Sequence, residues 1–126
     1  MPSPSDRVYT ESHEWHRLEG DIVTLGVTQF AVNELTDITY VELKPAGTAI
    51  AAKGSVGEIE SVKATSDVYC AVGGTIVEVN KALTDDPSLV NSDPYGKGWL
   101  VKIRVADPSP LKNLLDQASY DKQYPL

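Results

Sequence analysis

The stretch Glu58-Ile59-Glu60-Ser61-Val62-Lys63-Ala64-Thr65-Ser66-Asp67 places a single lysine between two short runs of strand-forming residues. Residues 56–61 and 67–72 carry the Val, Ile and Tyr side chains that favour β-strands, and small or polar residues lie between the two runs. This pattern predicts a β-hairpin with Lys63 at or near its tip. A lysine at a hairpin tip is solvated and adds almost nothing to stability. Its use must therefore lie in its amine or in a group attached to it.

The charged neighbours of Lys63 indicate how that amine can be used. Glu58, Glu60 and Asp67 lie close to it in the sequence, and nearby carboxylates favour the protonated ammonium form. A lysine that forms a Schiff base must present a free amine, which requires burial or a neighbouring cation. The pattern therefore disfavours an enzyme that uses Lys63 directly. It favours a lysine that a separate enzyme acylates, with the hairpin presenting the side chain in one geometry.

The rest of the chain alternates short strand-like segments with turns rich in Gly and Pro. In addition to the lysine hairpin, strands are predicted at residues 9–18, 22–25, 37–43, 48–52, 75–79 and 99–105. The last segment alternates most clearly, with Lys102 and Arg104 on the side opposite its apolar residues. His13 and His16 fall in the first segment without a nucleophile motif, so structural or surface roles are expected for both. The pattern predicts a mainly β sandwich or barrel.

Two short helices are expected where capping residues precede apolar patterns. Thr28 can cap a helix that runs to Leu35. Ser109 can cap a C-terminal helix that has Pro110 in its first position. The expected inner face of that helix consists of Leu111, Leu114, Leu115 and Ala118. No linker divides the chain, so residues 1–126 are expected to form a single domain.

Composition argues against several classes of function. The 126 residues carry a net charge of −7, which argues against nucleic acid or an anionic membrane as a partner. The acidic surface serves solubility, or it docks basic surfaces of partner enzymes, and composition leaves both interpretations open. Cys70 is the one cysteine, so no internal disulfide can form, and we expect it to be a small strand residue. With only two histidines beside it, a Cys/His zinc site cannot be assembled, and no metal is expected.

The sequence shows no membrane or targeting segment. No stretch approaches the roughly 20 apolar residues that a membrane-spanning helix needs. Residues 1–7 hold two prolines and two serines and are expected to form an irregular lead-in, without an apolar signal segment or an Arg-rich amphipathic helix. We therefore expect a bacterial cytoplasmic protein, or a protein of the mitochondrial matrix whose presequence has been removed.

Four blocks of the sequence, in order, resemble the glycine cleavage system H-protein family. They are Tyr9-Thr10…Ser12-His13-Glu14-Trp15, Glu60-Ser61-Val62-Lys63-Ala64-Thr65-Ser66-Asp67, Val79-Asn80…Leu83, and Leu89-Val90-Asn91-Ser92-Asp93-Pro94-Tyr95-Gly96 with Gly98-Trp99-Leu100. The resemblance implies a lipoyl/biotinyl-type flattened β-sandwich, or barrel-sandwich hybrid, with short flanking helices and a C-terminal helix. It also implies a non-enzymatic carrier with lipoate attached covalently to Lys63 as N6-lipoyllysine.

The resemblance implies partners and further site residues. In the family, the lipoyl arm takes an aminomethyl group from glycine decarboxylase (P protein) to the aminomethyltransferase (T protein). Dihydrolipoamide dehydrogenase (L protein) reoxidises the arm, and a lipoyl or octanoyl transferase or a lipoate ligase attaches it. Glu14 would supply an anion for the amine of the loaded arm, with Ser12 and Asp67 near the arm. From residue chemistry alone, Glu14 is equally well a surface carboxylate beside a core tryptophan. We expect no catalytic residue in this chain, and a monomer.

Other functions are open to the same fold. A biotin carrier usually has methionine on both sides of its lysine, and the neighbours Val62 and Ala64 disfavour that function. A lipoyl-relay protein, which donates lipoyl groups to 2-oxoacid dehydrogenase complexes, is not separated from a glycine cleavage carrier by the motif. The chain departs from the family where Thr36 replaces a common glycine, at Asn33, and at residues 70–73, which lack the usual proline. Local differences in the first helix and in the exit strand of the hairpin are therefore expected.

Overall fold

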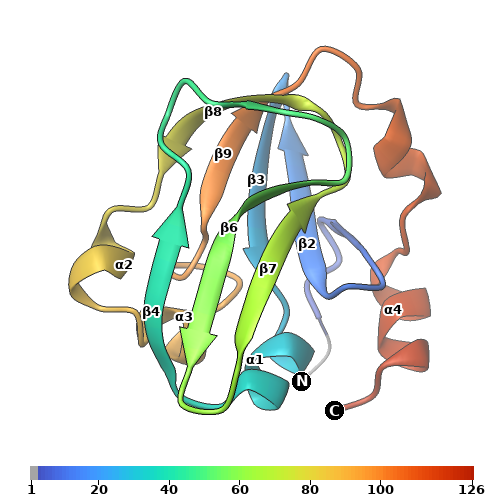
Figure 1. The fold of residues 1–126 in the computed structure, drawn as a ribbon. Coiled ribbons are helices and arrows are strands. Elements are labelled where there is room, and N and C mark those ends of the chain that lie inside the picture. The colour runs from blue at the N-terminus through green and yellow to red at the C-terminus, as the bar shows by residue number, and fades with distance from the viewer. Residues whose placement is uncertain (1–2) are drawn as a thin grey trace.

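The structure, a computed structural model, describes residues 3–126, so Met1 and Pro2 of the expected lead-in lie outside the described residues. Two antiparallel sheets face each other, one of six strands in the order β1-β2-β3-β9-β8-β5 and one of three in the order β4-β6-β7 (Figure 1). The strands are β1 (Val8–Tyr9), β2 (Glu14–Glu19), β3 (Ile22–Val27), β4 (Ile38–Leu43), β5 (Ala49–Ile50), β6 (Gly54–Ser61), β7 (Thr65–Cys70), β8 (Gly74–Val79) and β9 (Val101–Arg104). The mainly β sandwich expected from the sequence is confirmed.

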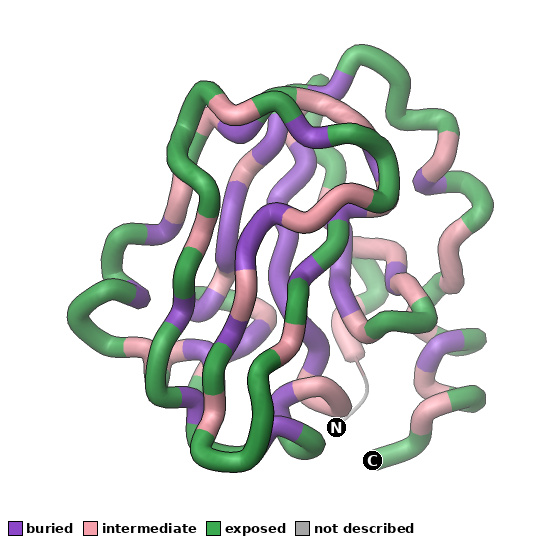
Figure 2. The backbone as a smooth tube through the Cα atoms, in the orientation of Figure 1, coloured by how far each residue is buried: buried purple, intermediate pink, exposed green. Residues whose placement is uncertain are grey.

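Buried residues are concentrated in the strands of both sheets (Figure 2), and their apolar side chains form one core cluster. Val56, Ile59 and Val68 reach it from the three-stranded sheet, and Leu25 and Ile103 from the six-stranded sheet; none is more than 1% exposed. Burying each such side chain contributes about 1.5–3 kcal/mol. The inner faces of β6 and β7 are thereby fixed, and the turn between them is left outside the core.

Strand β9 shows the alternation that the sequence predicts. Val101 and Ile103 are fully buried, while Lys102 is half-buried and Arg104 is exposed. The strand pairs with β3 on one side and β8 on the other, which makes it a central strand of the larger sheet. The prediction succeeds here because one face of the strand is buried against the core.

The predicted first strand, residues 9–18, is wrong as a continuous strand. It is interrupted by a turn at residues 10–13, so that His13 lies in the turn and only His16 lies in a strand. His13 has φ +72°, which no strand residue adopts. The turn is closed by backbone hydrogen bonds from His13 N to Thr10 O (3.1 Å) and from Thr10 N to Glu14 O (3.0 Å). This interruption sets the direction in which Glu14 enters β2.

The C-terminal helix exists but begins later than predicted. Residues Ser109–Asn113 form a 3₁₀ helix, Leu114 is extended, and the α-helix α4 (Gln117–Gln123) is capped by the Asp116 side chain, not by Ser109. Leu115 exchanges two backbone hydrogen bonds with Tyr9 of β1 (2.8 and 2.9 Å). This long-range strand pairing interrupts the helix at the leucines whose spacing predicts one continuous apolar face. Of the four predicted inner-face residues only Ala118 lies in α4, and it is exposed; the buried residue of that helix is Tyr120.

Three more short helices flank the sandwich: α1 (Gln29–Leu35), α2 (Ala82–Asp85) and α3 (Leu89–Ser92). The predicted cap of α1 is confirmed, because the Thr28 side chain accepts a hydrogen bond from Ala31 N at 3.2 Å. The helix ends at Thr36, which has φ +65° and ψ −138°. That region is occupied almost only by glycine, so a β-branched residue there is strained. Thr36 departs from the family at the position where the backbone favours glycine.

Replacing Thr36 with glycine is expected to stabilise the protein. Relief of the strained backbone contributes about 1–3 kcal/mol, and the added freedom of glycine in the unfolded chain offsets up to about 1 kcal/mol of that. The midpoint of thermal unfolding should rise by several degrees, measured by calorimetry. The replacement Asn33→Gly, in the exposed part of the same helix, is the control and should lower stability. A Thr36→Gly protein that is less stable than the original would contradict the assigned strain.

Candidate functional site

The hairpin between β6 and β7 ends in a tight turn (Figure 1). Lys63 lies in this turn and is exposed to solvent. The Ser61 hydroxyl holds the turn, accepting hydrogen bonds from the backbone N–H groups of Lys63 (3.1 Å) and Ala64 (3.0 Å). The Ser61 backbone N–H donates to Ala64 O across the turn (2.8 Å). Lys63 therefore lies at the exposed tip of a hairpin, as the sequence predicts.

The Lys63 amine is not committed to an ion pair. The three salt bridges found among residues 3–126 do not include it. Its Nζ lies 3.4 Å from the backbone carbonyl of Glu34, near the C-terminal end of α1, where the helix dipole favours a cation. The neighbouring Val62 is 69% exposed, although its backbone N–H donates to Asp37 O (3.1 Å). The turn is thus anchored through its backbone, while the side chains of Val62 and Lys63 stay exposed to solvent.

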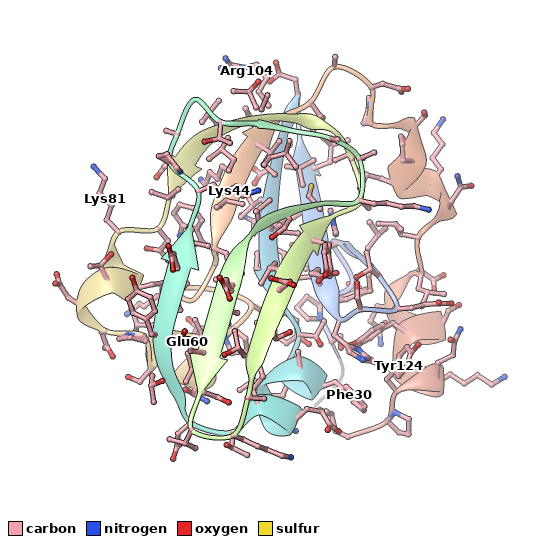
Figure 3. The ribbon with its side chains drawn as sticks, viewed as in Figure 1. Phe30, Lys44, Glu60, Lys81, Arg104 and Tyr124 are labelled. Atoms are coloured by element: carbon pink, nitrogen blue, oxygen red, sulfur yellow. The ribbon has the colours of Figure 1, made fainter. Side chains whose placement is uncertain are left out.

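Carboxylates line the outer face of the same sheet. In the strand register, Glu42 lies opposite Glu58, and Glu58 lies opposite Asp67. Glu60, which Figure 3 labels, lies on the same face as Glu58 and two residues nearer the turn. Like charges directly opposite each other across strands are destabilising. The chain therefore carries an acidic face beside its exposed lysine at some cost in stability.

Glu14 of β2 is buried, so its interpretation as a surface carboxylate is wrong. Its side chain is 2% exposed and lies beside the core residue Trp15. Oε1 accepts hydrogen bonds from the hydroxyls of Thr10 (2.6 Å) and Ser12 (2.5 Å), and Oε2 accepts one from the backbone N–H of Tyr69 (3.1 Å). The turn at residues 10–13 and strand β7 together hold the carboxylate in one orientation.

The electrostatics of Glu14 favour a cation nearby. Burial raises the pKa of Glu14 above its usual range, while the hydrogen bonds from Ser12, Thr10 and Tyr69 oppose that rise. None of the salt bridges found in the described part of the chain includes this carboxylate. A buried carboxylate without a cationic partner is costly. A positively charged ligand that reaches Glu14 would remove part of that cost.

Glu14 lines a cavity with a volume of about 560 Å³. Ser12 and Thr10 line the same cavity, and Leu114 and Leu115 from the C-terminal segment supply apolar wall. The structure thus brings two of the predicted site residues, Ser12 and Glu14, into one polar corner of a mainly apolar cavity.

Asp67 lies elsewhere. Its side chain is on the outer face of the three-stranded sheet, where it accepts a hydrogen bond from the Tyr69 hydroxyl at 3.3 Å. It lines a separate cavity of about 270 Å³ together with Glu42 and Glu58. Tyr69 lies four steps along β7 from Thr65, which is beside the turn, and this corresponds to about 13 Å of strand.

Strand β7 is an edge strand, and two side chains of β2 accept hydrogen bonds from backbone N–H groups along that edge. Glu14 accepts from Tyr69 N, and His16 Nε2 accepts from the backbone N–H of Ala71 at 3.0 Å. His16 is 1% exposed, and its Nδ1 has no hydrogen-bond partner among residues 3–126. Burial lowers the pKa of His16 to about 4, so the imidazole is neutral at neutral pH. His16 thus has the structural role that the sequence predicts, as a tie between the two sheets.

Sequence reasoning missed several residues around Glu14. Thr10 belongs to the first of the four blocks that resemble the family. It lies four residues before Glu14 and carries a hydroxyl, and this spacing is the signal that could have indicated a contact with the carboxylate. Tyr69 contributes through its backbone N–H, which leaves no trace in side-chain chemistry. Leu114 and Leu115 were assigned to the inner face of a helix. Cys70, which also lines the cavity, is a buried strand residue as predicted, and burial raises the pKa of its thiol to about 11.

Two kinds of feature are absent from residues 3–126. No helix there is long and apolar enough to cross a membrane. No cluster of three or more His, Cys, Asp or Glu side chains in that range has an arrangement able to hold a metal ion.

A flattened two-sheet sandwich with an exposed hairpin lysine defines a carrier domain of the lipoyl type. A family model described as glycine cleavage H-protein matches residues 7–125. A glycine cleavage system H protein from a Cyanothece species is 50% identical over 120 residues, covering 95% of this chain and 93% of that protein. One from Methylacidiphilum infernorum is 47% identical over 122 residues, with 97% and 95% covered.

The fold is shared with a solved member. The crystal structure of a glycine cleavage system H protein from Mycobacterium marinum superposes with a TM-score of 0.89 at 39% identity, covering 98% of this chain and 100% of that one. This chain belongs to the glycine cleavage H-protein family. The lipoyl-type fold and the role of lipoyl carrier in glycine cleavage are confirmed, and the relay function is not favoured.

Proposed function

We propose that this chain carries lipoate in amide linkage on Lys63 and is a non-enzymatic subunit whose arm visits the active sites of other proteins. The observation that carries the proposal is the position of Lys63, exposed at a turn whose backbone is fixed by Ser61. When attached there, lipoate would supply the disulfide that is reduced as it accepts the aminomethyl cargo, and the dithiol that is left once the cargo has been released. The proposal treats residues 1–126 as one carrier domain and a monomer.

The turn explains how a modifying enzyme selects this amine. The Ser61 hydroxyl and the anchored backbone of Val62 present Lys63 in a single geometry, and the adjacent side chain of Val62 offers apolar contact. A lipoyl or octanoyl transferase, or a lipoate ligase, would recognise that shape and supply the base that the acidic surroundings do not. Attachment removes the lysine charge and leaves a flexible arm, and tethering keeps the local concentration at each docked site near the millimolar range, as an order of magnitude.

The cavity at Glu14 would hold the loaded end of the arm. A carboxylate has about four lone-pair sites, and three donors occupy Glu14, so one site remains for the cationic amine of the cargo. Thr10 and Ser12 fix Oε1, and the apolar side chains of Leu114 and Leu115 exclude water. Excluding water protects a hydrolytically fragile cargo. Asp67 is assigned to the path of the arm along β7, outside this cavity.

The partners follow from the same assignment. Glycine decarboxylase (P protein), the aminomethyltransferase (T protein) and dihydrolipoamide dehydrogenase (L protein) would each receive the arm. The row of Glu42, Glu58 and Asp67 lies beside the lysine turn and suits docking against basic surfaces. The proposed compartment is the bacterial cytoplasm, which the bacterial origin of the relatives supports.

Replacing Glu14 with glutamine tests the cavity assignment. The variant should be lipoylated and loaded normally, but it should lose its aminomethyl cargo at least about tenfold faster, because a hydrogen bond to a charged group contributes about 1.5–3 kcal/mol. The release of formaldehyde and ammonia from the isolated loaded protein measures this rate.

The matched control is Glu11→Gln, because Glu11 lines the same cavity but is exposed. It should keep the original rate. Equal retention in the Glu14→Gln variant and the unchanged protein would remove Glu14 from the site and leave the assignment of Lys63 standing.

A further inference from the structure

The turn that supports Glu14 is tied to the C-terminal helix through one hydroxyl. Tyr120 of α4 is 1% exposed, and its Oη lies 2.8 Å from Nδ1 of His13 and 2.7 Å from Oγ1 of Thr28. Three segments that are distant in the sequence therefore meet at this atom: the turn at residues 10–13, the cap of α1, and α4. Neither the sequence motifs nor the cavity accounts for this contact.

The direction of the hydrogen bonds follows from counting donors. Ala31 N–H donates to Thr28 Oγ1, and Thr28 is fully buried, so its own hydroxyl proton needs an acceptor. If Thr28 donates to Tyr120, then Tyr120 donates to His13 Nδ1, and no hydroxyl proton is left over. In the reverse direction Tyr120 donates to Thr28, and the buried Thr28 hydroxyl proton is left without an acceptor. His13 is then a neutral imidazole that accepts at Nδ1, in agreement with the lowering of its pKa by burial.

Aromatic packing holds the His13 ring in place. Its centroid lies 4.5 Å from Phe30, 4.7 Å from Tyr124 and 5.9 Å from Tyr120. Figure 3 labels Phe30 and Tyr124, which approach each other from α1 and α4, and their ring centroids are 5.4 Å apart. His13 has φ +72°, a conformation that disfavours residues other than glycine. Contacts of the side chain must therefore compensate for that backbone.

The same turn supplies both hydroxyls that bind Glu14 Oε1. Thr10 and Ser12 belong to it, and the His13 backbone closes it, donating to Thr10 O at 3.1 Å and accepting from Thr28 N at 3.0 Å. We propose that Tyr120 is a positioning residue for the Glu14 carboxylate, acting through His13 and this turn. The expected effect on cargo retention rests on the proposed function. The positioning of Glu14 by Tyr120 does not, because it can be measured in the protein without lipoate.

The test compares Tyr120→Phe with Tyr124→Phe. Both remove one hydroxyl from the same aromatic group, Tyr120 within α4 and Tyr124 at its C-terminal cap. Tyr124 Oη makes no hydrogen bond within residues 3–126, whereas Tyr120 Oη makes two. The first readout is the titration of Glu14 in the unmodified protein, followed by carbon NMR of its carboxyl. Tyr120→Phe should raise the pKa of Glu14 further, by about half a unit or more, because loosening the turn weakens hydrogen bonds that lower it. Tyr124→Phe should leave it unchanged.

The second readout is cargo loss from the lipoylated protein. It should be about fivefold faster in Tyr120→Phe, as expected when one net hydrogen bond of about 1 kcal/mol is lost, and unchanged in Tyr124→Phe. If Tyr120→Phe does not fold, His13 carries the test. His13→Leu should shift the Glu14 titration, whereas His13→Asn keeps an acceptor near the Nδ1 position, tolerates positive φ, and should restore it.

The outcomes separate the two proposals. An unchanged Glu14 titration in Tyr120→Phe, or in His13→Leu, overturns the positioning role whatever the cargo does. If the Glu14 titration shifts in Tyr120→Phe but Glu14→Gln loses its cargo at the original rate, the cavity assignment is overturned and the positioning role stands. A shift of equal size in Tyr124→Phe also overturns the proposal, because the hydroxyl bonds would then not be the cause.

Discussion

Replacing Lys63 with arginine is expected to reduce glycine cleavage to background in a system reconstituted with the P, T and L proteins. Arginine keeps the positive charge and the length of the side chain, and the exposed turn around it is held by Ser61 and backbone groups that the replacement does not touch. Its guanidinium does not accept the lipoyl group in place of the lysine amine. The measurement is the glycine-dependent formation of NADH, and the folded state of the variant is checked by circular dichroism.

The control is Lys44→Arg. Lys44 is an exposed lysine that follows β4 of the same sheet, and Figure 3 labels it away from the turn. Turnover should be unchanged, because the lysine turn and the cavity at Glu14 keep all their residues. Turnover by Lys63→Arg at the original rate would end the proposal that this amine carries the arm.

Acid is expected to destabilise the protein between pH 6.5 and pH 4 through His16. The pKa of His16 is lowered by burial from 6.5 to about 4 in the folded state, so in this window the unfolded chain binds a proton that the folded chain does not. Stability is therefore complete above pH 6.5 and is lost as the pH falls. The loss amounts to about 3 kcal/mol, at about 1.4 kcal/mol for each unit of pKa. Urea unfolding at a series of pH values measures it.

The variant His16→Gln isolates this effect. Glutamine can accept the hydrogen bond from Ala71 N but does not titrate, so its stability should depend much less on pH across the window. Glu14 acts in the opposite direction, because its pKa is raised and the folded state gains protons as the pH falls. The comparison of the two pH profiles cancels that contribution. Parallel profiles would show that His16 titrates normally in the folded state.

The parts of the molecule that the sequence predicts are those with a local signature. The lysine hairpin is predictable because strand-forming residues flank a short polar turn, and β9 because Val101 and Ile103 alternate with charged residues. The cap of α1 is predictable because Thr28 precedes an apolar helical pattern. In each case, neighbours in the chain determine the conformation.

The parts that the sequence does not predict depend on contacts between distant segments. Leu115 pairs with Tyr9, which interrupts the helix that its own spacing favours. Glu14 looks like an ordinary strand carboxylate until the turn before it and the backbone of Tyr69 enclose it. The sequence pattern predicts a strand at His13, because no neighbouring residue indicates that its φ is positive. Residue identity thus points to Lys63 directly, but the cavity needs the tertiary fold.

The most direct test is the mass of the intact protein after incubation with lipoate, ATP and a lipoate ligase, followed by mapping of the modified peptide. We predict one lipoyl group per chain, attached to Lys63, and none on the Lys63→Arg variant. A wild-type chain that stays unmodified, or a lipoyl group found on another lysine, would contradict the account.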